Sequence, residues 1–283
     1  MLLKAKIFLN PHSINFNQKL RIMNLNLEGK KAVVCGSSQG LGLASAIELS
    51  KLGACITLFS RNKSKLENAL KQLDTSKNQK HNFLIADFND QQQVHEAIQH
   101  HIKNHAVHIL VNNTGGPPGG TISEAQPEEF MRAFKAHVIC NQLITQAVLP
   151  SMKENNYGRI VNIISTSVKQ PIPGLGVSNT IRAAVANWAK TLSLEVGPFG
   201  ITVNNVLPGY TRTARYDSII EKKSGESGNS EDEIEANIIS QIPLRRIGEP
   251  EDFGAAVAFL CSPAASYISG INLPVDGGRT GCL

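Results

Sequence analysis

Short apolar runs alternate with helical segments along most of the chain, and this alternation restricts the folds that the chain can adopt. Seven runs rich in Val, Ile and Leu predict buried strands, at Lys31–Cys35, Ala54–Phe59, Asn82–Ala86, His108–Asn112, Arg159–Ile164, Ile201–Leu207 and Ile271–Pro274. Segments with a helical apolar period lie between them, at Leu41–Leu52, Lys63–Leu73, Gln91–Asn104, Glu128–Glu154, Val177–Val196 and Glu251–Cys261. Repeated strand–helix units join parallel strands by right-handed crossovers. We therefore predict an α/β fold with a single doubly wound, parallel seven-stranded sheet and helices on both faces.

Length, charge and cysteine usage exclude several classes of protein. A chain of 283 residues with 41% hydrophobic and 18% charged residues can bury one large α/β core. Its net charge of +5 comes mostly from residues 1–22, which hold four basic and no acidic side chains, so no basic face for nucleic acid is expected. No apolar run approaches the roughly 20 residues of a membrane helix, so no membrane partner is expected. The five scattered cysteines, without a CxxC pair, favour reduced thiols in a cytoplasmic protein.

The domain organisation is simple, with one interruption. We expect residues 1–24 to form a disordered extension and residues 25–283 to form one domain. A polar segment at about 210–245 breaks the strand–helix rhythm, and Ser218–Gln241 within it is rich in Gly, Ser and charged residues. This segment is either a solvated surface loop with a short helix or a mobile lid. The second interpretation follows because open α/β sheets bind ligands beyond the C-terminal ends of their strands.

Two histidines have a spacing that could suit a metal ion. His101 and His105 are separated by one helical turn. The surrounding sequence, QHHIKNH, is polar and holds no glutamate of the HExxH type. We therefore expect a solvated helix face here and no metal site.

A glycine-rich turn follows the first predicted strand and leads into a helix. It runs from Cys35 to Gly42 and reads CGSSQGLG. Glycines let the backbone turn tightly and approach a pyrophosphate, while the helix N-terminus offers free N–H groups and a positive dipole end. The turn therefore predicts a Rossmann-like dinucleotide site, formed by Gly36, Ser37, Ser38, Gln39, Gly40, Leu41 and Gly42.

The glycine spacing, GxxxGxG, resembles the TGxxxGxG motif of the short-chain dehydrogenase/reductase family, with Cys35 at the threonine position. The resemblance extends from about Leu27 to Gly278 and is generically closest to the 3-oxoacyl-[acyl-carrier-protein] reductases. Further matches are Asn112-Asn113-Thr114-Gly115 for the family's NNAG, Pro208-Gly209 for its turn beside the nicotinamide, and Val275-Asp276-Gly277-Gly278 for its terminal VDGG. The resemblance implies that the cofactor is contacted by Asp87, Phe88, Asn113, Thr114, Gly115, Arg182, Pro208, Gly209 and Thr211.

The end of the second strand bears on the choice of cofactor. An acidic residue there would bind the ribose hydroxyls and repel a 2′-phosphate, whereas an arginine would pair with that phosphate. No Asp or Glu occurs between Gly53 and Glu67, and Arg61 follows Ser60 at this place. Arg61 and Ser60, with Ser37 or Ser38, therefore indicate NADP(H) as the preferred cofactor, with NAD(H) possible.

The active site implied by the resemblance departs from the family pattern. The family uses an asparagine, a serine, and the tyrosine and lysine of a YxxxK pair. Its serine is Ser165 here, but its tyrosine position holds Ser178, its lysine position Arg182 and its asparagine position His137. No tyrosine lies between residues 158 and 208, so a shift of register does not supply one.

These replacements change the acid–base chemistry. A serine hydroxyl is a far weaker acid than a phenol and reaches less far, and an arginine stays protonated, so it cannot shuttle protons. Three other proton sources are open: His137, whose intrinsic pKa range suits such work; Tyr210, which follows the Pro-Gly turn; and water held by Ser165 and Ser178. The first two have other interpretations: His137 could be a packing residue, as helical histidines often are, and Tyr210 could pack against the lid.

We predict an oxidoreductase that acts on a carbonyl/alcohol pair with NAD(P)(H) and atypical acid–base residues. Its partner would be a small-molecule carbonyl or alcohol substrate. The alternative is an NADP(H)-binding, redox-inactive sensor or structural protein on the same fold. The helices Glu128–Glu154 and Val177–Val196 carry more apolar positions than one core face needs. Because the family pairs these helices between subunits, the resemblance implies a homodimer or homotetramer.

Overall fold

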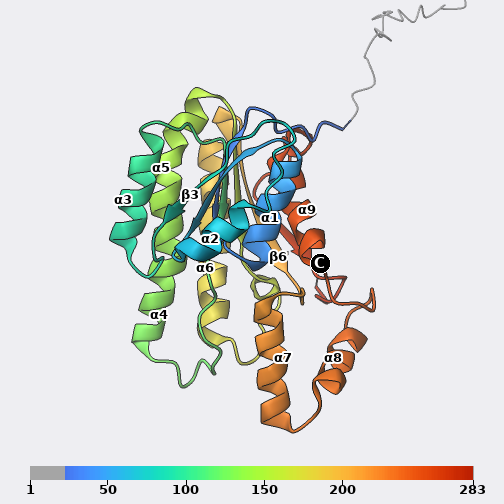
Figure 1. The fold of residues 1–283 in the computed structure, drawn as a ribbon. Coiled ribbons are helices and arrows are strands. Elements are labelled where there is room, and N and C mark those ends of the chain that lie inside the picture. The colour runs from blue at the N-terminus through green and yellow to red at the C-terminus, as the bar shows by residue number, and fades with distance from the viewer. Residues whose placement is uncertain (1–22, 283) are drawn as a thin grey trace, which may run out of the picture.

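Seven parallel strands form one sheet in the computed structural model, which describes residues 23–282 (Figure 1). Their order across the sheet is β3-β2-β1-β4-β5-β6-β7. The strands are β1 (Lys31–Cys35), β2 (Cys55–Ser60), β3 (Asn82–Ile85), β4 (Ile109–Asn112), β5 (Gly158–Ile163), β6 (Ile201–Pro208) and β7 (Asn272–Val275). The predicted sheet is therefore confirmed. The extension expected over residues 1–24 lies, up to residue 22, outside the described residues.

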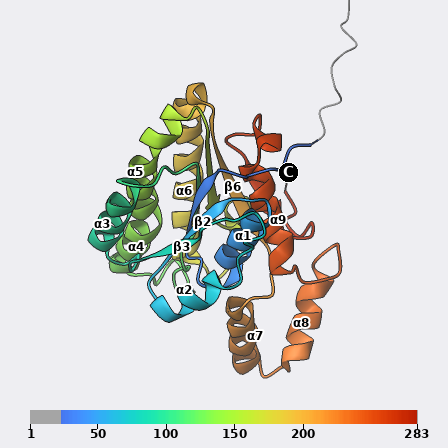
Figure 2. The ribbon, with the colours of Figure 1, turned by 45° about the horizontal axis from the view of Figure 1, so that its top comes forward.

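Helices cover both faces of the sheet, as predicted (Figures 1 and 2). One face packs against α1 (Gly40–Lys51), α2 (Lys63–Leu70) and α9 (Pro250–Cys261), and the other against α3 (Gln91–Ile102), α5 (Cys140–Glu154) and α6 (Gly176–Val196). Short 3-10 turns are η2 (Thr166–Val168), η3 (Gly197–Phe199) and η4 (Pro263–Ala265). Because the central strands are buried on both sides, their sequences read as largely continuous apolar runs, whereas the edge strands β3 and β7 are only partly buried.

Asparagines link four neighbouring strands in register. Asn112 donates to Asn162 (2.9 Å), Asn162 donates to Asn205 (2.9 Å), and Asn205 donates to Asn272 (2.8 Å). Each bond joins side-chain amides of directly paired residues on β4, β5, β6 and β7. A buried amide is stable only with a partner, so this row fixes the register of the four strands.

The helix expected over Glu128–Glu154 is interrupted. It divides into α4 (Pro127–Phe134), a π-helical turn η1 (Lys135–Ile139) and α5. A π turn accommodates one extra residue within the helix, and such turns are frequent at functional sites. Here the π turn contains His137, whose side chain is only 3% exposed.

The polar segment is helical rather than a loop with one short helix. It forms α7 (Ala214–Ser227) and α8 (Glu231–Ser240), joined at Gly228 with a φ of +75°. In both Figure 1 and Figure 2 these helices project from the body at one end of the sheet. They bury a small apolar cluster of their own, made by Tyr216, Ile220, Ile238, Ile242 and Ile247. The loop interpretation was wrong because a few buried residues suffice to anchor two otherwise polar helices.

The solvated helix face expected around His101 and His105 is wrong for His101, which is buried. His101 is 6% exposed and stacks on His105, with ring centroids 4.7 Å apart. Burial, and after it the charge of His105, lowers the pKa of His101 to about 4, so the ring is neutral near pH 7. Among residues 23–282 no group of metal-ligating side chains gathers, and no helix there is long and apolar enough to cross a membrane.

Candidate active site

The predicted site residues gather where the strand order reverses. β1 lies between β2 and β4, where the strand order reverses, and open α/β sheets bind ligands beyond the strand ends at such a point. We call the region beyond the ends of β1 and β4, between the glycine turn and the Asn113–Gly115 segment, the crevice. Asn113 joins the two, because its side-chain amide donates to the Gly36 carbonyl at 3.1 Å.

The glycines of the turn are required by close packing. Gly36 has a φ of +56°, and a Cβ there would lie 2.7 Å from the Asn113 side-chain nitrogen. A Cβ on Gly42 would lie 2.8 Å from the same nitrogen and would overlap the Gly36 carbonyl oxygen. Both positions therefore exclude any side chain. The N-terminus of α1, which begins at Gly40, is left facing the crevice with no side-chain cap.

The hydroxyl of Ser37 is occupied within the fold. It donates to the Val34 carbonyl at 2.6 Å and accepts from the Phe59 N–H at 3.0 Å, and the residue is fully buried. Ser37 thus fastens the turn to β2. Ser38 lies differently, with its hydroxyl 3.2 Å from that of Ser60 at the end of β2.

Arg61 lies beside this serine pair and is exposed. Its guanidinium forms a 3.5 Å ion pair with Asp87, which is also largely exposed. Backbone hydrogen bonding from Asn89 is the main cause that lowers the pKa of Asp87, and Arg61 contributes. A surface pair of this kind contributes about 0–1 kcal/mol, so a stronger anion could replace the carboxylate. Phe88 follows Asp87 and packs edge-on against Phe59, with ring centroids 5.2 Å apart.

His137 and Thr114 contact each other between the π turn and the segment that follows β4. Nδ1 of His137 lies 2.5 Å from the Thr114 hydroxyl. Burial, and after it the charge of Arg182, lowers the pKa of His137 to about 3. The ring is therefore neutral near pH 7, where it can hold a hydrogen bond but is rarely protonated.

Ser178 and Arg182 lie on one face of α6, four residues apart, and both are buried. Arg182 donates through Nη1 to the Ile163 carbonyl at 2.9 Å, at the end of β5. Burial, and after it the charge of Arg215, lowers the pKa of Arg182 to about 10, so the guanidinium remains charged near pH 7. Ser165, which begins η2 just after β5, accepts from the Ser167 N–H at 3.1 Å. The structure thus brings Ser165, Ser178, Arg182 and His137 to one end of the sheet.

The titration of His137 predicts an effect on stability. The unfolded chain protonates this histidine near pH 6.5, whereas the folded chain resists protonation down to about pH 3. The unfolded state therefore binds more protons below pH 6.5, and the free energy of unfolding should fall by about 2 kcal/mol between pH 6.5 and 5 from this group alone. We expect His137→Asn to remove that part of the loss in urea titrations at the two pH values. His100→Asn, at an exposed position, should keep the wild-type dependence; equal slopes for all three proteins would contradict the assignment.

Tyr210 lies against the two projecting helices. Its ring packs edge-on on Tyr216, with centroids 6.1 Å apart, and the Arg279 guanidinium lies 5.0 Å from its centroid. Tyr210 and Thr211 also line a cavity of about 350 Å³ next to the Val275–Gly278 segment. Gly209 fits tightly against that segment, since a Cβ there would lie 2.6 Å from Asp276. Tyr210 therefore packs against α7, while the lid and a role of Tyr210 in the reaction stay predictions.

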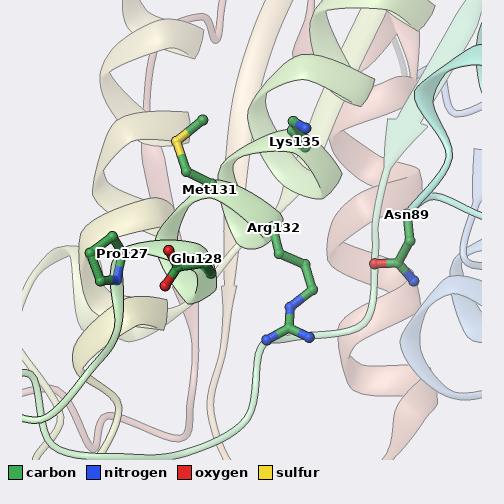
Figure 3. Close-up of a pocket in the computed structure, with 6 residues that line it drawn as sticks. All are labelled: Asn89, Pro127, Glu128, Met131, Arg132 and Lys135. Carbon is green, nitrogen blue, oxygen red and sulfur yellow. The ribbon is translucent and has the colours of Figure 1, made fainter.

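Another surface cavity lies away from these residues. It has a volume of about 360 Å³ and is lined by Asn89, Pro127, Glu128, Met131, Arg132 and Lys135. Figure 3 shows Arg132 extending from α4, with Asn89 on a separate segment to its right. None of its lining residues was predicted to be catalytic or to bind the cofactor.

Two features of the site were missed from the sequence. The asparagine row that links β4 to β7 could have been inferred from Asn162 and Asn205, which are unusual in otherwise apolar strands. The contact between Thr114 and His137 joins residues 23 positions apart and had no sequence signal beyond the two motifs themselves.

Comparison with known proteins agrees with this geometry. The family model described as enoyl-(acyl carrier protein) reductase matches residues 36–280. The NADPH-dependent reductase BacG of Bacillus subtilis is 29% identical over 88% of this chain and 97% of its own length. The 3-oxoacyl-[acyl-carrier-protein] reductase FabG of Haemophilus influenzae is 33% identical over 89% of this chain and 98% of its own.

A solved structure shares the whole architecture. L-sorbose reductase from Gluconobacter frateurii, in complex with NADPH and L-sorbose, has a TM-score of 0.86 and 28% identity, and the match covers 92% of this chain and 100% of that one. The family model spans the glycine turn, the crevice and the C-terminal Gly-Gly segment in one continuous match. The chain therefore belongs to the short-chain dehydrogenase/reductase family.

Proposed function

We propose that this protein is an NADP(H)-dependent oxidoreductase that interconverts a carbonyl compound and an alcohol with atypical acid–base residues. The observation that carries the proposal is the junction of the glycine turn with Asn113, which leaves a backbone cradle next to Thr114, His137 and Arg182. When bound, the nicotinamide cofactor would supply or accept the hydride, and the protein would bind, orient and exchange the proton.

The residues present fit a dinucleotide. Gly36 and Gly42 let the turn pack tightly against Asn113, where a Cβ would clash, and the uncapped start of α1 offers free N–H groups to a diphosphate. By the family pattern, Asn113, Gly115 and the Pro208-Gly209 turn would hold the nicotinamide side of the cofactor. The similar BacG is named an NADPH-dependent reductase, and the similar L-sorbose reductase was solved with NADPH. Both support NADP(H) over NAD(H) as the cofactor.

The 2′-phosphate would be held by Ser38, Ser60 and Arg61. The Ser37 hydroxyl is already bonded within the fold, so we assign it a structural part in the turn. The paired hydroxyls of Ser38 and Ser60 and the exposed Arg61 remain for the phosphate. Phosphate would take the place of Asp87 as the partner of Arg61, because a dianion forms stronger charge-assisted hydrogen bonds.

This assignment predicts a change in cofactor preference. Arg61→Asp should weaken NADP(H) binding about thirtyfold, the effect expected for the loss of a charged hydrogen bond of about 2 kcal/mol, and should change NAD(H) binding little. Calorimetric titration with each cofactor measures both constants. Lys71→Asp gives the same change in net charge at an exposed residue after α2 and should leave both constants unchanged. Equal losses for the two cofactors in Arg61→Asp would refute the role.

In the proposed chemistry, Ser165 and Ser178 hydrogen-bond the substrate oxygen and Arg182 stabilises its developing negative charge. A fixed cation in a site with little water is an effective partner for an oxyanion. His137 is neutral and bonded to Thr114, so it orients neighbouring groups rather than supplying the proton. We assign the proton to water held by Ser165 and Ser178, and Tyr210 to the lid.

The test separates binding from turnover. NADPH binding is measured by calorimetry, and NADPH oxidation is followed by absorbance across a panel of ketones and aldehydes. We expect binding together with oxidation by at least one substrate class. Binding without oxidation across the panel would overturn the proposal in favour of a redox-inactive sensor or structural protein.

We also propose a homo-oligomer built on the outer faces of α4, η1 and α6. Met131 and Leu194 are 57% and 70% exposed, and Phe134 lies beside Met131 on α4 with 37% exposed. Leu194 lies in the last turn of α6, whereas α4 packs against the first turns of that helix, so apolar side chains are exposed along both helices and favour a covered surface. Light scattering of the purified protein distinguishes a monomer from a dimer or tetramer.

A further inference from the structure

The loops that follow β4 and β5 are joined by a backbone bridge. Residues 115–120 follow β4 and read GGPPGG, and another loop leads from η2 into α6. The Gly120 N–H donates to the Gly174 carbonyl at 2.8 Å, and the Gly176 N–H donates to the Gly120 carbonyl at 3.0 Å. These two hydrogen bonds pair Gly120 with Leu175 in parallel, as neighbouring strands of a sheet are paired. The loop after β4 is therefore fixed to the start of α6.

Both loops are held closely against α6. A Cβ on Gly176, the first residue of the helix, would lie 2.7 Å from the backbone nitrogen and Cα of Ile122, so the loop after β4 lies directly on the helix start. The loop that precedes α6 is fastened to the helix by Asn179, whose side-chain amide donates to the Ile172 carbonyl at 2.9 Å. The bridge therefore connects two segments that have little room to move apart.

The bridged loop runs along the face of α6 that carries Ser178 and Arg182. At one end, a Cβ on Gly116 would lie 3.6 Å from Nη2 of Arg182. At the other end, Gly120 is bonded to a residue two positions before Ser178. Both polar side chains are nearly covered, with 9% of Ser178 and 8% of Arg182 exposed. We call residues 116–120 the wall, because they border the two side chains that we assign to the substrate oxygen.

The wall is stiff as well as anchored. Pro117 and Pro118 stand between its two anchor points, and each ring fixes the backbone φ at about −65°. A flexible loop gives way to a bulky group by changing its backbone conformation. A short loop that is bonded at one end, packed at the other and fixed in the middle resists such a change. A substrate beside Ser178 therefore has to fit the wall as it stands.

We propose that the wall selects carbonyl compounds in which at least one of the two substituents is small. The proposal rests on the proposed function, in which Ser178 holds the substrate oxygen, and adds the class of substrate to it. A carbonyl carbon carries two substituents in the plane of its oxygen, so one of them is directed at the wall and the other away from it. A methyl group fits against the wall, whereas a longer chain meets backbone that cannot retreat.

Two isomeric ketones test the proposal. In 2-heptanone the smaller substituent is methyl, whereas both substituents of 4-heptanone are propyl, and the two ketones have the same composition. We expect wild-type kcat/KM with NADPH to favour 2-heptanone by about tenfold or more, and Gly120→Pro, which removes the bridging N–H, to reduce that preference to about twofold. Gly120→Ala keeps the N–H, and its Cβ meets no atom within 4 Å, so it should retain the wild-type preference.

A second variant opens the bridge from the other side. Gly176→Ala keeps every donor of the bridge, but its methyl group would lie 2.7 Å from the backbone of Ile122 and push the loop off the helix. It should lower the preference for 2-heptanone as Gly120→Pro does. The Kd of NADPH, measured by calorimetry, should stay within about twofold of the wild type in all three variants, because none of them changes a residue assigned to the cofactor. Thermal unfolding shows which variants are folded.

Three outcomes would overturn the proposal: equal kcat/KM for the two ketones in the wild type, an unchanged preference in every folded variant with an opened bridge, and a loss of preference in Gly120→Ala as large as in Gly120→Pro. If the wild type reduces neither ketone, their binding to the NADP⁺-saturated protein is measured by calorimetry, where the same order of affinities is expected. Equal affinities, or no binding of 2-heptanone, would then overturn the wall. Failure of the proposed function has a different sign, which is the absence of NADPH oxidation across the whole panel of ketones and aldehydes.

Discussion

Replacement of Ser178 by Tyr together with Arg182 by Lys is expected to raise kcat for reduction of a neutral ketone on the order of a hundredfold. The double change would install a phenol four residues before an ammonium on one face of α6. The ammonium lowers the phenol pKa, and a positioned general acid of this kind contributes about 10²–10⁴ in rate. The wild-type site, in our proposal, has only water and serine hydroxyls for the same task. NADPH oxidation at saturating ketone measures the gain.

The single variants identify the cause of any gain. Ser178→Tyr alone should give part of the increase, because Arg182 also favours the phenolate, and Arg182→Lys alone should give none. Ser178→Phe carries the same ring without the hydroxyl, so it should show no gain while it keeps the bulk of the tyrosine. An unchanged rate in the double variant, with NADPH binding and thermal unfolding as in the wild type, would show that Ser178 does not occupy the proton-donor position.

The sheet and its two helical layers could be predicted because burial leaves a periodic record in the sequence. A strand covered on both faces is apolar at its buried positions, as residues 32–35 of β1 are, and the covering helices are apolar on one side only. The π turn at Lys135–Ile139 left no such record, since one extra residue hardly changes the apolar period around it. The helices α7 and α8 escaped prediction because their buried face consists of few residues.

Within the site, motifs could be placed but contacts could not. The glycine turn was predictable because backbone close to a phosphate excludes side chains wherever it occurs. The hydrogen bonds of the Ser37 hydroxyl were not predictable. Its partners are Val34 and Phe59, and Phe59 comes close only because β1 pairs with β2. The lack of a carboxylate near Arg182 among the described residues was not predictable either, because it depends on where the tertiary fold places the acidic side chains.

Gly42→Ala is expected to abolish cofactor binding, with at least a hundredfold rise in the Kd for NADPH. The added methyl group would lie 2.8 Å from the Asn113 side-chain nitrogen and would overlap the Gly36 carbonyl oxygen. The Gly36 oxygen cannot move freely because it belongs to the backbone. The Asn113 amide cannot move freely because it donates to that oxygen at 3.1 Å. The turn must therefore open, and an opened turn no longer presents its N–H groups to a diphosphate. Calorimetric titration with NADPH measures the loss.

The strain of this substitution also acts on folding, so binding and stability have to be measured together. Overpacking of this kind destabilises a protein by about 1–3 kcal/mol, which lowers the melting temperature but leaves most molecules folded at 25 °C. Gly197→Ala is the matched control, since a Cβ there meets no atom within 4 Å and the residue lies at the far end of α6. It should bind NADPH as the wild type does. A folded Gly42→Ala protein with wild-type affinity for NADPH would show that the dinucleotide does not lie against the turn, and every role assigned to the crevice would then lose its basis.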